Sequence, residues 1–320
     1  MSIARLAPAM LVFLVNAAAG QGPAYPVKPV RIVVPSSPGG GTDILARVLA
    51  QKMSESLGQQ FVVENRPGAG QVIGIEAVAH SAPDGYTLLM AASAIVINEV
   101  LYAKPPYDTL REFAPVTLVA SLPNILVVHP ALPVKSVREL IALAKTRPGQ
   151  LNYSSAGSGT SPHLSMELFR IMAGITLTHI PYKGTGPATV DLVAGQVQLS
   201  MPNVLTALPQ IKGGKLRALG VTSSKRATGL PDVPAIAESL PGYEAIQWYG
   251  VLAPAGTTRD IVGKLQVEIA RILALPDVKE RLAADGADAV GNRPDEFAAY
   301  IRAELAKWGK VVKTGGIKLE

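Results

Sequence analysis

The fold is decided by residues Arg31–Ala50, which read RIVVPSSPGGGTDILARVLA. The β-branched run Ile32–Val34 is typical of a buried strand. The apolar residues of Ile44–Leu49 recur with the spacing of one helix face. Between them, the segment Pro35–Asp43 contains two prolines that end the strand and three consecutive glycines. These residues predict a strand, a tight loop and a helix in succession.

The start of this predicted helix is suited to an anion. Thr42 or Asp43 can cap the helix, while Gly39, Gly40 and Gly41 let a ligand approach the backbone closely. Free N–H groups at the positive end of a helix bind anions. The same residues also fit an ordinary turn before a capped helix, so both interpretations stay open here.

A second stretch, Leu151–Leu164, repeats this order of elements as LNYSSAGSGTSPHL. A short strand enters a loop of Ser, Gly and Thr. Pro162 stands at the predicted first helical position, and Ser161 is the predicted cap. Two such units, about a third of a chain apart, predict two lobes that face a common ligand.

Composition narrows the class of protein. The chain has 320 residues, 48% of them hydrophobic, 17% charged and 5% aromatic, which predicts a globular protein with a full core. It has no cysteine, which excludes disulfides, thiol catalysis and zinc–thiolate sites. The net charge of +6 is mild and scattered, so we expect no nucleic-acid partner.

Residues 1–19 are predicted to be a secretory signal peptide. Arg5 supplies a weak positive charge, Leu6–Val15 is mostly apolar, and Ala17–Ala19 offers a cleavage site. The apolar run is too short for a good membrane span. A disordered apolar N-terminus is the alternative.

The rest of the chain alternates strands and helices, which is typical of a parallel α/β sheet. Phe113–Ala120 and Ile125–His129 are predicted as strands that leave the first unit. Further strands are predicted at Phe61–Val63, Tyr86–Met90, Leu177–Ile180, Val197–Met201, Leu216–Val221 and Tyr249–Ala253. Helices are predicted at Ser136–Thr146 with Ser136 as cap, Thr189–Val193, Ile261–Leu275, Pro276–Ala284 and Pro294–Val312.

Enzymatic and cofactor motifs are incomplete. Gly68, Gly70 and Gly74 have the wrong spacing for a dinucleotide fingerprint. The four histidines show no metal-ligand spacing, so neither a cofactor nor a metal is expected. His163 with Ser161 or Ser165 could suggest a serine hydrolase, but the nucleophile elbow is missing.

Several segments together resemble the substrate-binding proteins of tripartite tricarboxylate transporters, the Bug receptor family. They cover the mature chain in order: Tyr25-Pro26, Lys28–Arg31, Pro38–Asp43, Val63–Gly70, Ala82–Leu88, Gly157–Leu164, Pro181–Gly184, Gly213–Leu219, Leu230–Pro234 and Leu252–Thr257.

This resemblance implies an α/β fold like that of type II periplasmic binding proteins, with two α/β lobes and a ligand cleft between them. Domain one would comprise residues 20–120 plus 248–320, and domain two residues 121–247. The crossovers would lie near Ala120 and Gln247.

The implied function is that of an exported, periplasmic and non-enzymatic receptor, expected to be a monomer. It would capture a small organic acid, a mono- or dicarboxylate that is possibly aromatic, and deliver it to membrane subunits of a tripartite tricarboxylate transporter. A periplasmic hydrolase using a Ser and His163, or a ligand-loaded partner of a membrane sensor, are the alternatives.

Backbone donors and hydroxyls of the two loops are the candidate ligand contacts, since they bind carboxylates without a buried cation. The first loop contributes Ser37, Gly39, Gly40, Gly41, Thr42 and Asp43. The second contributes Ser155, Gly157, Thr160, Ser161 and His163. Candidates at the rim are Ser93, Lys183, Thr185 and Asn203.

Two departures from the family pattern bear on the ligand. Ser36-Ser37 stand where the family usually has an aromatic residue, which leaves the first loop smaller and more polar. Pro202 stands where the family often has an aspartate. An enclosed ammonium needs an anionic partner, so we expect a plain carboxylate or dicarboxylate and not an amino acid.

Overall fold

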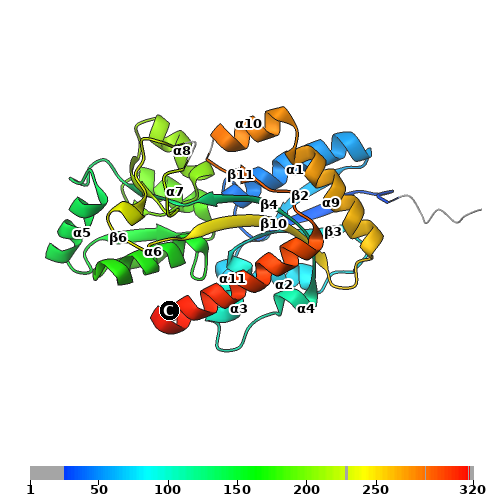
Figure 1. The fold of residues 1–320 in the computed structure, drawn as a ribbon, viewed down its shortest axis with the longest axis horizontal. Helices are drawn as coiled ribbons and strands as arrows, with labels where there is room; N and C mark the ends of the chain where they lie inside the picture. The colour runs from blue at the N-terminus through cyan, green and yellow to red at the C-terminus, as the bar shows by residue number, and fades with distance from the viewer. Residues whose placement is uncertain (1–24, 228–229, 285, 316, 318–320) are drawn as a thin grey trace, which may run out of the picture.

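The computed structural model describes residues 25–227, 230–284, 286–315 and 317. It has two β-sheets, each packed with helices and lying end to end (Figure 1). We call the elements around the six-stranded sheet the first lobe and those around the five-stranded sheet the second lobe. The predicted α/β class with two lobes is confirmed, whereas the predicted domain bounds stay a prediction. The predicted signal peptide lies outside the described residues.

The first-lobe sheet has the strand order β11-β4-β10-β3-β1-β2. β1 lies parallel to β2 and β3, with Ile32 opposite Val63 and Leu88. β10 runs antiparallel to β3 and β4. The strands are β1 (Val30–Val34), β2 (Phe61–Asn65), β3 (Thr87–Ala92), β4 (Phe113–Pro123), β10 (Ile246–Pro254) and β11 (Asp288–Ala289).

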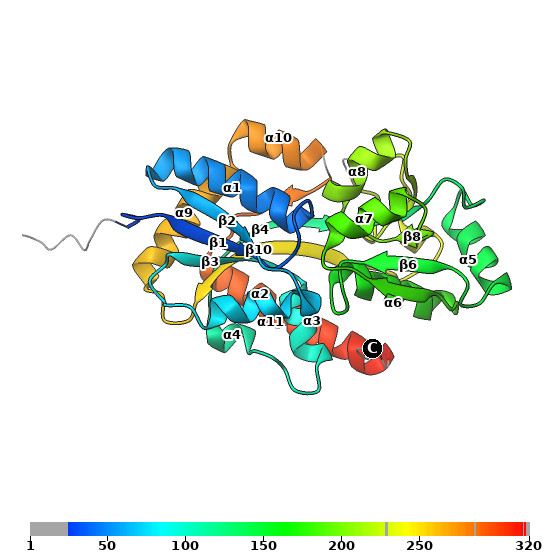
Figure 2. The same cartoon turned by 180° about the vertical axis from the view of Figure 1, so that it is seen from behind.

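Helices cover both faces of this sheet (Figures 1 and 2). One face carries α1 (Gly41–Leu57), α9 (Arg259–Leu273) and α10 (Pro276–Ala284). The other carries η1 (Ala69–Gln71), α2 (Val72–Ala79), α3 (Ala94–Leu101), α4 (Thr109–Glu112) and α11 (Pro294–Gly315). Trp248 of β10 anchors α11: its ring packs edge-on against Phe297, and its Nε1 donates to Glu304 at 3.1 Å.

The second-lobe sheet has the strand order β7-β6-β8-β5-β9. β6 is parallel to β7 and β8, whereas β5 is antiparallel to β8 and β9. Its strands are β5 (Ile125–Val128), β6 (Asn152–Ser155), β7 (Thr178–Pro181), β8 (Leu199–Ser200) and β9 (Arg217–Val221). Its helices are α5 (Val137–Thr146), α6 (Ser161–Ala173), α7 (Thr185–Val193), α8 (Val204–Lys212) and η2 (Ile236–Glu238).

Two adjacent strands lead from one lobe to the other. β4 runs into β5 through the single residue Asn124, and β10 returns beside β4 with Trp248 opposite Ser121. The predicted strand Phe113–Ala120 is part of β4, which leads out of the first lobe as predicted. This segment pairs along β10 inside the first-lobe sheet, because a strand that is buried on both faces and paired on both edges satisfies its backbone there.

The start of α5 agrees with the prediction, whereas the start of α7 does not. Ser136 accepts from the Glu139 N–H at 3.2 Å and caps α5 as predicted. α7 begins at Thr185, four residues before the predicted start, because Gly184 at its N-cap has no side chain to signal the boundary. Of the described helices, none is long and apolar enough to cross a membrane.

Candidate functional site

A small enclosed cavity lies between the lobes, at the starts of α1 and α6 and beside the crossing strands. Its volume of about 10 Å³ is room for roughly one water molecule. No charged side chain is among the described residues that line it. They are Ser36, Gly40, Thr42, Gln71, Ala92, Ala94, Asn124, Ala156, Thr160, Ser161, Pro162, Thr185, Asn203, Gln247 and Tyr249.

The first helix start is built from glycine and lacks a side-chain cap. α1 begins at Gly41, and its N-cap Gly40 makes no cap bond. The predicted caps Thr42 and Asp43 are wrong, because both residues lie inside the first helical turn. A Cβ on Gly41 would overlap the Tyr249 hydroxyl and lie 2.8 Å from Asn203 Oδ1. Only glycine therefore lets this helix end approach the cavity wall.

Both carboxylate oxygens of Asp43 accept hydrogen bonds from residues of the first lobe. Its Oδ2 accepts from the Gly39 N–H and from Arg47 Nε, both at 3.0 Å, and its Oδ1 accepts from Asn65 at 3.0 Å. Burial disfavours the carboxylate, but these hydrogen bonds outweigh burial and lower the pKa of Asp43. Asp43 therefore shapes the loop and does not line the cavity.

The second helix start presents hydroxyl groups. The N-cap of α6 is Thr160, whose hydroxyl donates to Gly157 O at 2.6 Å and accepts no hydrogen bond from the helix. Ser161 is the first helical residue, so the prediction of Ser161 as cap and Pro162 as first residue is one position late. Ser161 Oγ accepts from Asn124 Nδ2 at 2.8 Å. This bond ties the helix start to the segment that joins the lobes.

The crossing strands supply a further polar wall. Gln247 Oε1 accepts from the buried Ser93 hydroxyl at 2.6 Å, and the Gln247 side chain also bonds the phenol of Tyr249. Asn203 Oδ1 caps α8 by accepting from the Thr206 N–H at 3.1 Å. These bonds fix the side chains that face the cavity.

Three buried atoms on the cavity wall have no hydrogen-bond partner among the described residues: Ser36 Oγ, Gln71 Oε1 and Asn124 Oδ1. A buried polar atom without a partner is costly. The three atoms belong to three different segments: the first-lobe loop, the turn before α2 and the β4–β5 junction. Because all three segments line the same cavity, a ligand there could bond all three atoms.

Six predicted ligand contacts line the cavity, and three of the others shape it from outside. The six are Gly40, Thr42, Thr160, Ser161, Thr185 and Asn203. Gly39 and Gly41 belong to the first loop, and Ser93 holds Gln247. Their role in binding stays a prediction.

Ser37 and Lys183 join the two lobes at the rim. The Ser37 N–H and hydroxyl both donate to the Lys183 carbonyl oxygen, at 3.1 and 2.8 Å. A second contact between the lobes is close packing: a Cβ on Gly157 would lie 3.4 Å from the Cα of Gly70 in the first lobe. Backbone contacts close the lobes over the cavity.

Ser155 and His163 lie behind the second loop in a buried cluster of rings. Ser155 Oγ lies 2.6 Å from His179 Nε2, and the His163 and His179 rings stack at 4.3 Å. Burial lowers the pKa of His163 to about 4 and, with the nearby His163, that of His179 to about 3. His179 Nδ1 has no partner among the described residues, so this Ser–His pair lacks the acid of a catalytic triad.

Sequence reasoning missed Ser36, Gln71, Asn124, Gln247 and Tyr249 as lining residues. Ser36 adjoins the predicted Ser37, so its position in the loop was a usable signal. The others stand outside the two loops, and no local pattern distinguishes a Gln or Asn that faces a cavity from one that faces solvent.

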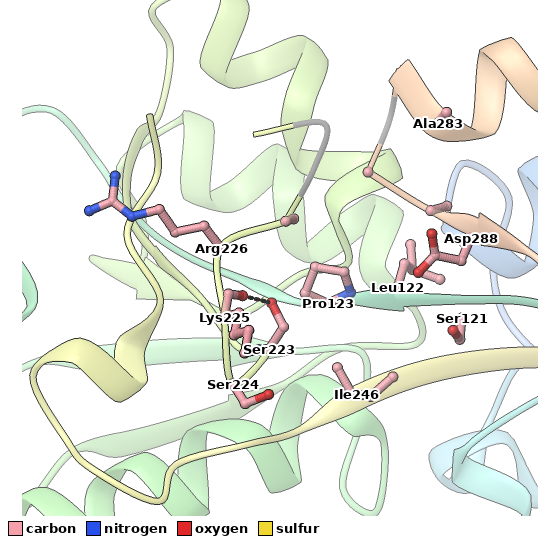
Figure 3. A pocket seen from close by; sticks show the side chains of 13 residues that line it. Ser121, Leu122, Pro123, Ser223, Ser224, Lys225, Arg226, Ile246, Ala283 and Asp288 are labelled. Atoms are coloured by element: carbon pink, nitrogen blue, oxygen red, sulfur yellow. Dashed lines mark hydrogen bonds between the residues drawn. The ribbon is translucent and has the colours of Figure 1, made fainter. Parts of the chain in front are cut away.

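A larger hollow of about 470 Å³ lies elsewhere along the crossing strands (Figure 3). The ends of β4 and β10, loop 223–227 and the segment before β11 surround it. None of its described lining atoms is a buried polar atom without a partner, and no helix of eight or more residues starts there. It is therefore the weaker candidate despite its size.

Two α/β lobes joined by crossing strands, with a polar cavity between them, define a solute receptor of the periplasmic-binding-protein class. The chain belongs to the tripartite tricarboxylate transporter family of receptors, whose family model matches residues 45–317.

No described group of three or more His, Asp or Glu side chains could hold a metal ion.

Individual relatives agree with this assignment. The chain is 41% identical to the protein BugT of Bordetella pertussis over the full length of both. It is similar to the solved structure of R. palustris Rpa4515 with adipate, with 40% identity, a TM-score of 0.89, and 92% of this chain and 99% of that chain covered. It is also similar to MatC of Rhodopseudomonas palustris with bound malate, at 34% identity and a TM-score of 0.87 over 90% of this chain and all of that one.

Proposed function

We propose that this receptor captures a small organic carboxylate in the cavity between its lobes, in the periplasm, and delivers it to the membrane subunits of a tripartite tricarboxylate transporter. The observation that carries this proposal is the convergence of two helix N-termini without side-chain caps, α1 and α6, on one cavity. Helix N-termini bind carboxylates through free N–H groups and the helix dipole.

The neutral wall of the cavity fits this role. Hydroxyls and amides surround the ligand, so binding would depend on hydrogen bonds and not on an ion pair. Adipate and malate in the two structural relatives are carboxylates of the expected kind. Binding through neutral donors lets the ligand leave without separating an ion pair, which suits a carrier.

The small volume predicts that the lobes move. A cavity with room for about one water molecule cannot admit an organic acid unless the lobes separate or the wall rearranges. The ligand would enter between separated lobes, and the Ser37–Lys183 contacts would form as they close.

A melting screen over organic acids tests the proposal. An acid at 100 times its Kd should stabilise the protein by about 2.7 kcal/mol. X-ray scattering with the same acid should show a smaller radius of gyration. If no acid shifts the melting temperature, the carboxylate-receptor proposal fails. If one does and the radius stays constant, the closing motion fails alone.

A further inference from the structure

The turn before α2 has an unusual backbone. Gly68, Ala69, Gly70 and Gln71 have φ angles of 133°, 46°, 59° and 84°. Within the described ranges, Ala69 and Gln71 are the non-glycine residues with positive φ. A side chain in this region is strained, and such strain persists only where neighbouring structure holds it.

Neighbouring groups hold this turn from both lobes. Asn98 of α3 donates to the Gly70 carbonyl oxygen at 2.8 Å, and the Gln71 N–H donates to Gly68 O at 2.9 Å. On the other side, Gly70 packs so closely against the Ser158 carbonyl of the second lobe that a Cβ would overlap it. Contacts with both lobes therefore hold the turn in its strained conformation.

The strained backbone directs the Gln71 side chain into the cavity. Gln71 is the N-cap of α2, yet its side chain makes no cap bond. It is 7% exposed, lines the cavity, and leaves its Oε1 without a partner among the described residues. Asn124, which is fully buried, presents a second amide oxygen without a partner on the same wall.

We propose that Gln71, together with Asn124, selects a carboxylate that also carries an uncharged hydrogen-bond donor, such as a hydroxyl or an amide N–H. This inference rests on the proposed function. Amide oxygens accept hydrogen bonds and repel a second carboxylate oxygen. A ligand ammonium would lack an anionic partner, because no carboxylate is among the described lining residues and Asp43 is already bonded to Arg47 and Asn65.

Matched acids test this selection by calorimetry. Malate, succinate and aspartate share one carbon chain and differ by a hydroxyl, a hydrogen and an ammonium; 2-hydroxyglutarate, glutarate and glutamate form a longer set. We expect the hydroxy acid of the better-fitting set to bind at least about tenfold tighter than its two analogues, because a site built for a hydroxyl rejects a ligand that lacks it.

Equal affinity for the hydroxy and unsubstituted acids would overturn the inference, as would tightest binding of the amino acid. Either result would leave the proposed function standing, because a carboxylate would still bind. Failure of every organic acid in the wider melting screen would overturn both.

Two glycine variants separate the role of the side chain from that of the backbone. Gln71→Gly and Ala69→Gly each relieve a positive φ in the same turn, but the Ala69 side chain is exposed and does not line the cavity. Without ligand, both variants should melt no lower than the parent. Only Gln71→Gly should bring the affinity ratio of hydroxy to unsubstituted acid close to one. An unchanged ratio in Gln71→Gly, or an equal loss in Ala69→Gly, would overturn the role of Gln71.

Discussion

The two loops that face the cavity each lead from a strand into a helix, but they contribute different groups. Loop 35–40 of the first lobe ends in glycines, and Gly41 packs directly against Tyr249 and Asn203. Loop 156–160 of the second lobe ends in hydroxyls, and Asn124 ties Ser161 to the crossing strands. The first loop thus places glycines at the cavity wall, while the second places the hydroxyls of Thr160 and Ser161 there. Similar local sequences therefore supply different parts of one site.

The largest predicted effect comes from adding one carbon to the first loop. Gly41→Ala places a Cβ against the Tyr249 hydroxyl and Asn203, so the helix start must move away from the cavity. We expect carboxylate affinity to fall at least about 100-fold, which is about 2.8 kcal/mol. Gly263→Ala in α9 is the matched control, because a Cβ there meets nothing within 4 Å. Equal affinities in the two variants would show that the first loop does not shape the site.

The second loop should respond to loss of hydroxyls. In Thr160→Ala/Ser161→Ala, a charge-assisted hydrogen bond to the carboxylate is lost, which is worth about 1.5–3 kcal/mol. Calorimetry should show a fall in affinity of tenfold or more with the fold intact. Ser136→Ala is the control: it removes the cap of α5 and should cost about 1 kcal/mol of stability without changing affinity. Unchanged affinity in the double variant would place the ligand elsewhere.

Acid should destabilise the second lobe before the first. The pKa of His163 is lowered from an ordinary 6.5 to about 4, so the folded state binds fewer protons than the unfolded one between these values. Its stabilising contribution is complete above about pH 6.5 and is lost as pH falls towards 4, by about 1 kcal/mol between pH 6.5 and 5.5. The pKa of Asp43 is lowered from 3.8, so its contribution disappears only below about pH 4.

Denaturant titrations across pH check this difference. His163→Asn keeps an acceptor for the Gly159 N–H, which bonds His163 Nδ1 at 3.2 Å in the parent protein. It should reduce the pH dependence between 6.5 and 5 by about half, because the pKa of the neighbouring His179 is also lowered, to about 3. Ser136→Ala, which removes the cap of α5 but no titratable group, is the control and should leave the pH dependence unchanged. If Asp43→Asn removed the pH dependence between 6.5 and 5 instead, acid would destabilise the first lobe before the second.

The smallest effect is expected at the rim. Ser37→Ala removes the hydroxyl bond to the Lys183 carbonyl but keeps the backbone bond from the Ser37 N–H. An exposed hydrogen bond contributes about 0.5 kcal/mol, so affinity should fall roughly two- to threefold, mainly through faster dissociation. Ser158→Ala, in the facing loop, contacts the other lobe through its carbonyl and should change little. A tenfold loss in Ser37→Ala would make the rim as important as the cavity wall.

The sequence predicted the order of strands and helices well, because buried apolar runs and helix-ending glycines act on residues near them in the chain. The buried runs at Ile32–Val34 and Tyr86–Met90 form neighbouring parallel strands, and Gly58 ends α1 as expected for a residue that accepts a left-handed conformation. Where no cap residue marks a boundary, as at Thr185, the prediction shifted by several residues. The strand at β4 was predicted, but its pairing with β10 was not, because the two strands lie more than a hundred residues apart in the chain.

By itself, the sequence determined the two-lobed α/β class, the two loops and six of the residues on the cavity wall, because β-branched runs, glycines and hydroxyls act through near neighbours in the chain. Only the tertiary structure decided which side chains complete the wall. Gln71 reaches it through a strained turn held by Asn98, and Asn124 and Gln247 reach it from the crossing strands. Their surroundings are made by residues distant in sequence, so no pattern along the chain could assign them to the cavity.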